Sequence, residues 1–161
     1  MMKKYLAPLA IVSFLLMSSA STFAQCKEWK WPEEPEQKAK AEEKVSLYDD
    51  YRKNNEFVKA KPHINWLLTN TPNLNTSIYI NGAEIYQKLA SAEKDAAKKN
   101  VLVDSLLLIH DLRIKNCGEE ASVTNRKALA AVAFWANETG KEKYVLDLMD
   151  QAFKLNGNNV L

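Results

Sequence analysis

Apolar residues recur at spacings of three and four along the chain from residue 36 onward, and the alternation typical of strands is not seen there. This period predicts six helices separated by short polar breaks. Their expected ranges are 36–53, 56–69, 76–92, 95–115, 122–138 and 142–155. Because short turns join consecutive helices, the helices should pair as three antiparallel hairpins. The sequence therefore predicts an all-α helical array.

Prolines and glycines mark several features of these helices. The second helix should stop before Pro72, whose ring and missing N–H oppose continuation. Gly118 is expected to cap the fourth helix. Gly82 lies inside the third helix, where glycine costs about 1 kcal/mol relative to alanine, and indicates close contact with another helix. The apolar stretch VLVDSLLLIHDLRI predicts that the fourth helix lies in the centre of the array.

The first 24 residues have the organisation of a secretory signal peptide. Lys3 and Lys4 form a basic start, an apolar run spans residues 5–17, and small residues precede an expected cleavage after Ala24. The apolar run is too short for a stable membrane span. We therefore expect an exported protein of the periplasm or cell envelope, without a stable transmembrane segment.

An arm rich in Trp, Pro and Glu should follow, over residues 25–35, because its two prolines oppose a helix. Trp29 and Trp31 are expected to pack back onto the helical domain of residues 36–161. In the alternative interpretation, the two rings form an exposed contact surface. The sequence thus divides into a signal peptide, an extended arm and one helical domain.

The mature chain has two cysteines, Cys26 and Cys117. In an oxidising compartment they could form a disulfide, which closes a loop of roughly 90 residues and contributes about 4 kcal/mol. Spacing alone does not show that the two lie close together, so free thiols are an alternative. As a further alternative, Cys26 is acylated as a lipoprotein cysteine, although Gln25 stands where such signals carry a small residue. The Cys and His spacings of zinc or redox sites are not present.

Charge narrows the class of partner. The chain has 22 basic and 20 acidic residues, and removal of Lys3 and Lys4 leaves 20 of each. A balanced mature protein has no net field to attract nucleic acid or an anionic membrane. We therefore expect a protein or peptide partner, recognised by shape and local contacts.

Motifs for catalysis and cofactor binding are not found in the sequence. The two histidines, His63 and His110, show no triad pattern, and His110 falls on an apolar stripe typical of a hydrogen-bonded core residue. The four glycines are not spaced for a phosphate-binding loop. Adjacent carboxylates such as Glu42 and Glu43 are typical of a solvated surface. The sequence thus favours a protein that is not an enzyme and has no cofactor or metal.

One helix pair carries a recognisable motif. The first two helices resemble a tetratricopeptide repeat, a helix-turn-helix unit of 34 residues, through Leu47, Tyr51, Phe57, Ala60, Ile64, Leu67 and Pro72. Tyr48 departs from the motif, which prefers a small residue there. The second hairpin has Gly82 at such a small position, and the third has Ala133, Ala136, Gly140 and Ala152. These two hairpins resemble degenerate repeats.

A longer stretch carries a closer resemblance. SIYINGAEIYQKLASAEKDAAKKNVLVDSLLLIHDLRIK, followed by GEE, is similar to the N-terminal domain of exported tetratricopeptide-repeat proteins of the Bacteroidota envelope. The resemblance covers residues 26–161 and implies a non-enzymatic α-helical scaffold. Members of that family are usually longer, which implies a short or truncated version here.

In repeats of this kind the first helix of each hairpin lines a concave face that takes up a peptide or a partner helix. Repeat register would place on that face Asp49, Arg52 and Lys53, then Tyr79, Ala83 and Tyr86, then Lys127, Phe134 and Asn137. Tyrosine is favoured at interfaces, but the two tyrosine rings could equally fill space between hairpins. Val45 and Asp49 stand where a carboxylate clamp needs Lys and Asn, so binding of a C-terminal carboxylate is not expected.

Three functions follow from these observations. The favoured one is an exported scaffold that docks a partner segment on the concave face. The second is a structural or capping domain that packs on further repeats or on another subunit, and an exposed apolar patch over residues 145–153 would favour it. The third is a periplasmic hydrolase, which needs a cleft with two carboxylates about 5 to 10 Å apart.

Overall fold

The computed structural model describes residues 26–159, so the predicted signal peptide, Gln25 and the last two residues lie outside the described part. The described residues form six α-helices and no strand. In order along the chain they are α1 (Pro35–Lys53), α2 (Phe57–Asn70), α3 (Ser77–Ala92), α4 (Ala96–Cys117), α5 (Glu120–Trp135), α6 (Glu142–Asn156) and a final 3₁₀ turn, η1 (Gly157–Asn159). The predicted all-α fold is confirmed.

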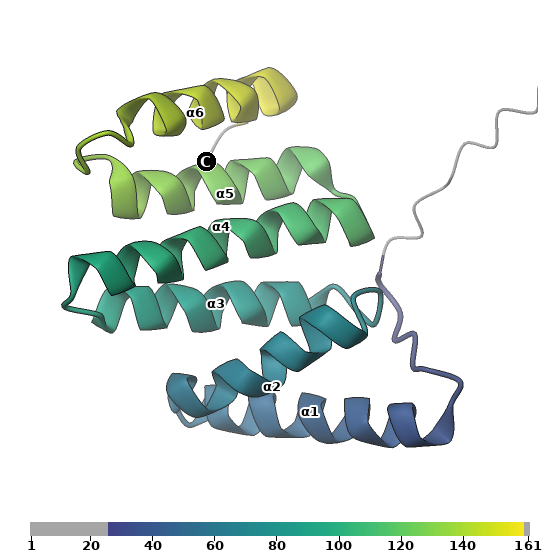
Figure 1. The fold of residues 1–161 in the computed structure, drawn as a ribbon. Coiled ribbons are helices and arrows are strands. Elements are labelled where there is room, and N and C mark those ends of the chain that lie inside the picture. Colours follow the sequence, from purple (N-terminus) through teal and green to yellow (C-terminus); the bar gives the residue numbers. More distant parts are fainter. Residues whose placement is uncertain (1–25, 160–161) are drawn as a thin grey trace, which may run out of the picture.

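The helices stack in the order in which they follow along the chain (Figure 1). The closest packing is within three hairpins, α1 with α2, α3 with α4, and α5 with α6, and α2 and α4 then join each hairpin to the next. The helix α4 lies between α3 and α5, as its apolar sequence predicts. The chain is therefore a linear array of three hairpins.

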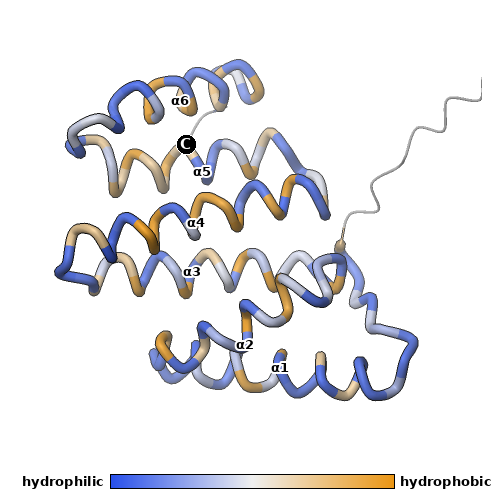
Figure 2. The backbone as a smooth tube through the Cα atoms, viewed as in Figure 1, coloured by the Kyte–Doolittle hydropathy of each residue, from blue (hydrophilic) through white to orange (hydrophobic). Residues whose placement is uncertain are grey.

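Two clusters of buried side chains hold the array together. The first cluster contains side chains from the arm and from the helices α1, α2, α3 and α4, and it includes Leu106 and Ile109 of α4. The second joins α4 to α5 and α6, and it includes Val103 and Leu107 of α4. Full burial of such side chains contributes about 1.5 to 3 kcal/mol each. The helix α4 thus contributes side chains to both clusters. The outer helix α1 is largely polar (Figure 2).

The observed helix ends follow local signals. At its N-terminus α4 is capped by Asp95, whose carboxylate accepts a hydrogen bond of 2.9 Å from the Lys98 N–H. Gly118 follows the last residue of α4 with a φ of 81°, which glycine adopts without strain. The helix α5 differs most from its predicted range of 122–138. It begins two residues earlier, at Glu120, because only Gly118 and Glu119 separate it from α4. It ends at Trp135, where the Glu138 N–H donates to the Trp135 carbonyl in a turn.

Gly82 lies where α3 packs against two neighbours. A Cβ atom at this position would be 3.4 Å from Ile64 Cγ1 on α2 and 3.6 Å from Ile109 Cδ1 on α4. These distances are ordinary van der Waals contacts, with no room for a longer side chain. The close helix contact predicted from this glycine is confirmed.

We expect Gly82→Ala to raise the free energy of unfolding by up to about 1 kcal/mol, because alanine favours the helix and its methyl group fits. Gly82→Leu should instead lower it by about 1 to 3 kcal/mol through overpacking. Denaturant unfolding followed by circular dichroism measures both. A destabilised alanine variant would show that the helices approach too closely for a methyl group.

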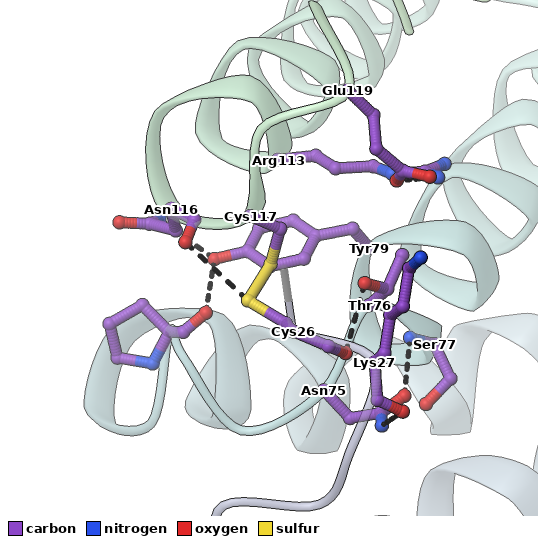
Figure 3. The surroundings of a disulfide bond; sticks show 11 residues. Cys26, Lys27, Asn75, Thr76, Ser77, Tyr79, Arg113, Asn116, Cys117 and Glu119 are labelled. Atoms are coloured by element: carbon purple, nitrogen blue, oxygen red, sulfur yellow. Dashed lines mark hydrogen bonds and ion pairs between the residues drawn. A yellow bond between two sulfur atoms is a disulfide. The ribbon is translucent and has the colours of Figure 1, made fainter. Parts of the chain in front are cut away.

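A disulfide between Cys26 and Cys117 fixes the arm to the end of α4, with 2.09 Å between the sulfur atoms (Figure 3). The Cys26 carbonyl accepts hydrogen bonds from the Thr76 N–H at 2.7 Å and the Thr76 hydroxyl at 3.0 Å. The Asn75 side chain donates to the Lys27 carbonyl at 3.1 Å. Of the alternatives that the sequence left open for the cysteines, the structure contains the disulfide.

The two tryptophans of the arm have different surroundings. Trp31 packs, partly buried, against the first cluster. Trp29 is 43% exposed and stacks on Trp31, with the ring centroids 4.9 Å apart. Trp31 therefore packs back onto the domain as predicted, whereas Trp29 exposes part of its ring to solvent.

Candidate functional site

A groove of about 420 Å³ runs along α3, α4 and α5. We call it the α3–α5 groove. It is formed by the first helices of the second and third hairpins, with α4 between them. Its residues are Tyr79, Ile80, Ala83, Glu84 and Gln87 of α3, Leu106, His110 and Arg113 of α4, and Arg126, Leu129 and Ala130 of α5.

Helical spacing explains the apolar part of the groove. Ile80 on α3 and Leu129 on α5 are 51% and 37% exposed, which is high for side chains of this size. Ala83 lies one turn from Ile80 on α3, and Ala130 is adjacent to Leu129 on α5. Both alanines are small and leave the groove open. The buried Leu106 of α4 therefore lines the groove between two apolar rims.

The basic part of the groove comes from two arginines. Arg113 of α4 is only 7% exposed, and its Nη2 donates to Glu119 Oε2 at 2.6 Å. Its buried Nε atom has no hydrogen-bonding partner among the described residues. Arg126 of α5 is exposed and makes no ion pair with any residue from 26 to 159. One guanidinium of the groove is thus neutralised and the other is not.

His110 lies on α4 one turn from Arg113 and also lines the groove. It is 8% exposed, so the buried position that the sequence predicts is confirmed. Burial lowers the pKa of His110 to about 4, and the positive charge of Arg113 adds to this effect. The imidazole is therefore neutral at pH 7.

This pKa predicts that the protein loses stability as the pH falls from about 7 to 4. The unfolded chain binds a proton on His110 near pH 6.5, whereas the folded chain binds it only near pH 4. Between these values unfolding takes up a proton, so acid favours the unfolded state, by at most about 3 kcal/mol. Below about pH 4 this contribution changes no further.

The measurement compares denaturant unfolding of the wild type and His110→Gln across this pH range, together with a proton NMR titration of the two histidines. The variant should lose less stability on acidification than the wild type. His63→Gln serves as the comparison variant: burial lowers the pKa of His63 as well, but the shift is smaller than for His110, so this variant should change the acid response less. Titration of the His110 imidazole above pH 6 would contradict the prediction.

The two tyrosines predicted to bind a partner are buried. Tyr79 is 1% exposed, and its hydroxyl donates to the Pro72 carbonyl at 2.7 Å and accepts from the Asn116 amide at 2.8 Å (Figure 3). Tyr86 is 6% exposed and donates to Asn65 Oδ1 at 2.9 Å. Burial raises the pKa of both phenols. The rings fill space between hairpins, which is one of the two alternatives that the sequence left open for them. Tyr79 still lines one end of the groove.

The predicted residues of α1 lie outside the groove. Arg52 donates to Asp49 at 2.8 Å and to Glu84 at 2.9 Å, and Glu84 belongs to the groove. Lys53 is exposed and pairs with Asp49 at 2.6 Å. The Arg52–Glu84 pair joins α1 to α3 and neutralises Glu84, whereas the two pairs with Asp49 lie within α1. The structure therefore assigns Arg52 a supporting contact behind the groove.

The predicted residues near α5 also lie outside the groove. Lys127 is paired with Asp111 at 2.7 Å, Phe134 is half-buried against the two core clusters, and Asn137 is exposed in the turn after α5. The groove instead takes Arg126 and residues 129 and 130 from this helix. A shift of one residue turns a helical side chain by about 100°, so the predicted register pointed to the adjacent face. Of the predicted binding residues, only Tyr79 and Ala83 line the groove.

A smaller pocket of about 350 Å³ lies between α4 and the start of α6. It contains Asp104 and Asp111, which are seven residues apart on α4, a rise of about 10 Å. Asp111 is already bound by Lys127. This pocket does not offer the closely spaced pair of free carboxylates that a glycoside hydrolase uses.

Within residues 26–159, no three His, Cys, Asp or Glu side chains come together in a way that could hold a metal ion. In the same part of the chain, every helix is too short or too polar to cross a membrane. The α3–α5 groove is thus the candidate site on which a function can be argued.

Comparison of the chain with protein-family models, with curated proteins and with solved structures gives no match.

Proposed function

We propose that the protein is a non-enzymatic scaffold that docks a segment of a partner protein in the α3–α5 groove. The observation that carries the proposal is the pair of exposed apolar side chains, Ile80 and Leu129, on opposite rims of an open groove. Exposed apolar groups around a cleft are typical of a surface that another molecule covers. Helix faces of this kind accept amphipathic helices and extended peptides.

Docking would proceed by burial of an apolar side chain of the partner between the two rims. Each CH₂ group removed from water contributes about 0.8 kcal/mol. The groove is held in shape by Leu106, by the tight contact at Gly82 and by the bonded Tyr79 hydroxyl. Because these groups are ordered without a ligand, little conformational entropy is lost when the partner binds.

The tetratricopeptide-like interpretation and the export of the protein belong to the same proposal. In such repeats the first helices line the binding face, and here α3 and α5 do so. The predicted signal peptide and the disulfide both suit an oxidising compartment. The sulfur of Cys26 is bonded to Cys117 and so is not free for acylation. This bond favours a periplasmic or envelope protein without a lipid on Cys26.

The test is capture of a partner by crosslinking in cells that produce the protein, followed by affinity purification and mass spectrometry. We expect a partner that the wild type captures and Ile80→Ala/Leu129→Ala loses, because the variant removes both apolar rims. Val58→Ala/Val101→Ala is the control, since it truncates two apolar side chains outside the groove that are even more exposed, at 75% and 64%. Capture that is unchanged in the rim variant would contradict the proposal.

A second candidate function rests on α6, the last helix of the stack (Figure 1). Its residues Leu146 and Phe153 are 68% and 55% exposed. They are seven residues apart and so share one side of the helix. In an antiparallel pair of α6 helices, Leu146 of each copy would meet Phe153 of the other through one two-fold axis. The occupant that this pattern fits is a second copy of the chain.

This second candidate is tested by the mass of the protein in solution. Sedimentation equilibrium should show a dimer for the wild type and a monomer for Leu146→Ser/Phe153→Ser. The exposed Val58→Ser is the control, because it changes the same kind of side chain on α2. A monomeric wild type at high protein concentration would exclude self-association through α6.

A further inference from the structure

We propose that the α3–α5 groove selects partner segments in which an Asp or Glu side chain lies beside an apolar side chain. Arg126 and Arg113 would bind the carboxylate, and Leu106 and Leu129 would hold the apolar group. This inference rests on the proposed docking function and specifies the chemistry of the segment that docks.

The order of residues along the groove separates its two parts. The helix α4 runs antiparallel to α3 and to α5, so residues near its C-terminus face the beginnings of both neighbours. Arg113 and Arg126 therefore lie toward the end marked by Tyr79, and Ile80 lies at that same end on the opposite rim. Leu106 lies toward the other end, and Leu129 is nearly one turn further along α5 than Arg126. An acidic and an apolar side chain of one segment can reach the two parts together.

The charges of the groove leave one positive charge without a partner. Glu84 is bound by Arg52, and Arg113 is bound by Glu119. His110 is neutral at pH 7 because burial keeps its pKa near 4. Of the charged residues that line the groove, only Arg126 forms no ion pair with another described residue. One carboxylate in the ligand therefore completes the charge balance of the groove.

Arg113 places a second guanidinium in the groove. Its side chain is more than nine-tenths buried, so water screens its charge only in part. A carboxylate is the acceptor that arginine binds with the best geometry. A partner carboxylate between the two guanidiniums would make charge-assisted hydrogen bonds in a partly shielded site.

We assign the carboxylate to a side chain within the segment, and not to a chain end, because Val45 and Asp49 stand where a clamp for a C-terminal carboxylate needs Lys and Asn. Gln87 lines the groove on α3, two turns along from Ile80, and can bond with the backbone of that segment. The partner is therefore an internal segment that runs along the groove.

The experiment selects short random peptides displayed within a loop of a carrier protein, so that no free chain end is offered. Peptides that bind the wild type should be enriched in Asp or Glu next to Leu, Ile, Met or Phe. Arg126→Glu should instead select Lys or Arg at the same place, since it reverses the charge of an exposed residue. Lys98→Glu, a charge reversal at an exposed residue of α4 outside the groove, should select the same peptides as the wild type.

Calorimetry with one selected peptide then measures the carboxylate contact. Replacing its Glu by Gln should weaken binding to the wild type about tenfold or more. Arg126→Gln should weaken binding of the Glu peptide to a similar extent, and the two changes together should cost little more than either alone. Circular dichroism of each variant checks that the fold is retained.

The outcomes separate this inference from the proposed function. If selected peptides lose binding in Ile80→Ala/Leu129→Ala but show no acidic preference, the groove docks partners and the acidic inference is wrong. If the acidic preference persists in Arg126→Glu, the arginine contact is wrong. If no peptide is selected and partner capture does not depend on the rims, both the inference and the proposed function fail.

Discussion

Replacing both cysteines with serine, as Cys26→Ser/Cys117→Ser, is expected to lower the free energy of unfolding by about 4 kcal/mol. The disulfide joins residues 91 positions apart, and restriction of the unfolded chain increases with the length of the loop that a crosslink closes. For a domain of this size, the midpoint of thermal unfolding should fall by roughly 15 °C. Reduced wild-type protein should behave like the double variant.

Loss of the disulfide should also release the arm before the rest of the protein unfolds. The arm is otherwise held by a few hydrogen bonds, including one of 2.8 Å from the Lys30 N–H to the Leu74 carbonyl. Hydrogen exchange at Lys30 should therefore become faster in the variant, while exchange in α4 changes only with global stability.

Guanidinium unfolding of the oxidised, reduced and double-serine proteins measures the change in stability. As a control, alkylation of the unreduced and unfolded protein should find no free thiol. Free thiols in protein purified from an oxidising compartment, or equal stability of the variant and the wild type, would contradict the structural role of this bond.

The second large effect is expected for Tyr79→Ala, which should lower the free energy of unfolding by about 3 to 5 kcal/mol. The ring is buried and fills space between hairpins, so its removal leaves a cavity. Tyr79→Phe keeps the ring and loses only the hydrogen bonds to Pro72 and Asn116, with an expected cost of about 1 to 3 kcal/mol. Tyr144→Ala, at a ring that is 40% exposed, should have a smaller effect than Tyr79→Ala.

Thermal and denaturant unfolding of the three variants provide the measurement. A Tyr79→Ala variant as stable as Tyr79→Phe would mean that the ring does not carry the packing seen in the structure. The expected result also decides how binding is tested. Alanine at Tyr79 or Tyr86 would reduce partner binding by destabilising the protein, whereas Ile80 and Leu129 can be changed with the core intact.

The helices and their order could be predicted from the sequence because a helix depends on neighbours three and four residues away. The last helix was expected over 142–155 and is α6, Glu142–Asn156, and the first was expected over 36–53 and is α1, Pro35–Lys53. Gly82 indicated a close helix contact, because a glycine inside a helix lowers helix stability and is expected where a larger side chain would not fit between helices. α5 was predicted less well because it begins directly after the short break at Gly118, and because it ends in a turn where Trp135 and Glu138 bond with Asn100 of α4.

The candidate site could be predicted only in part. The sequence placed a partner face on the first helices of the hairpins, and α3 and α5 do line the groove. It named Tyr79 and Ala83, but it did not find Arg126, Leu129 or the contribution of α4. The sequence did contain an indication that Ile80 and Leu129 are exposed, because each is a large apolar residue near the polar side of its helix. Their spacing could not reveal that they lie on opposite rims of one groove.

The sequence by itself determined the all-α fold, the three hairpins and the central position of α4, because these depend on short-range periodicity and on apolar burial. Only the tertiary structure decided that Cys26 meets Cys117, that Tyr79 turns inward, and that Arg126 is left without an acidic partner. Those outcomes depend on the rotation of each helix about its axis, where one residue of register turns a side chain by about 100°. That rotation is set by packing between helices, which no local pattern contains.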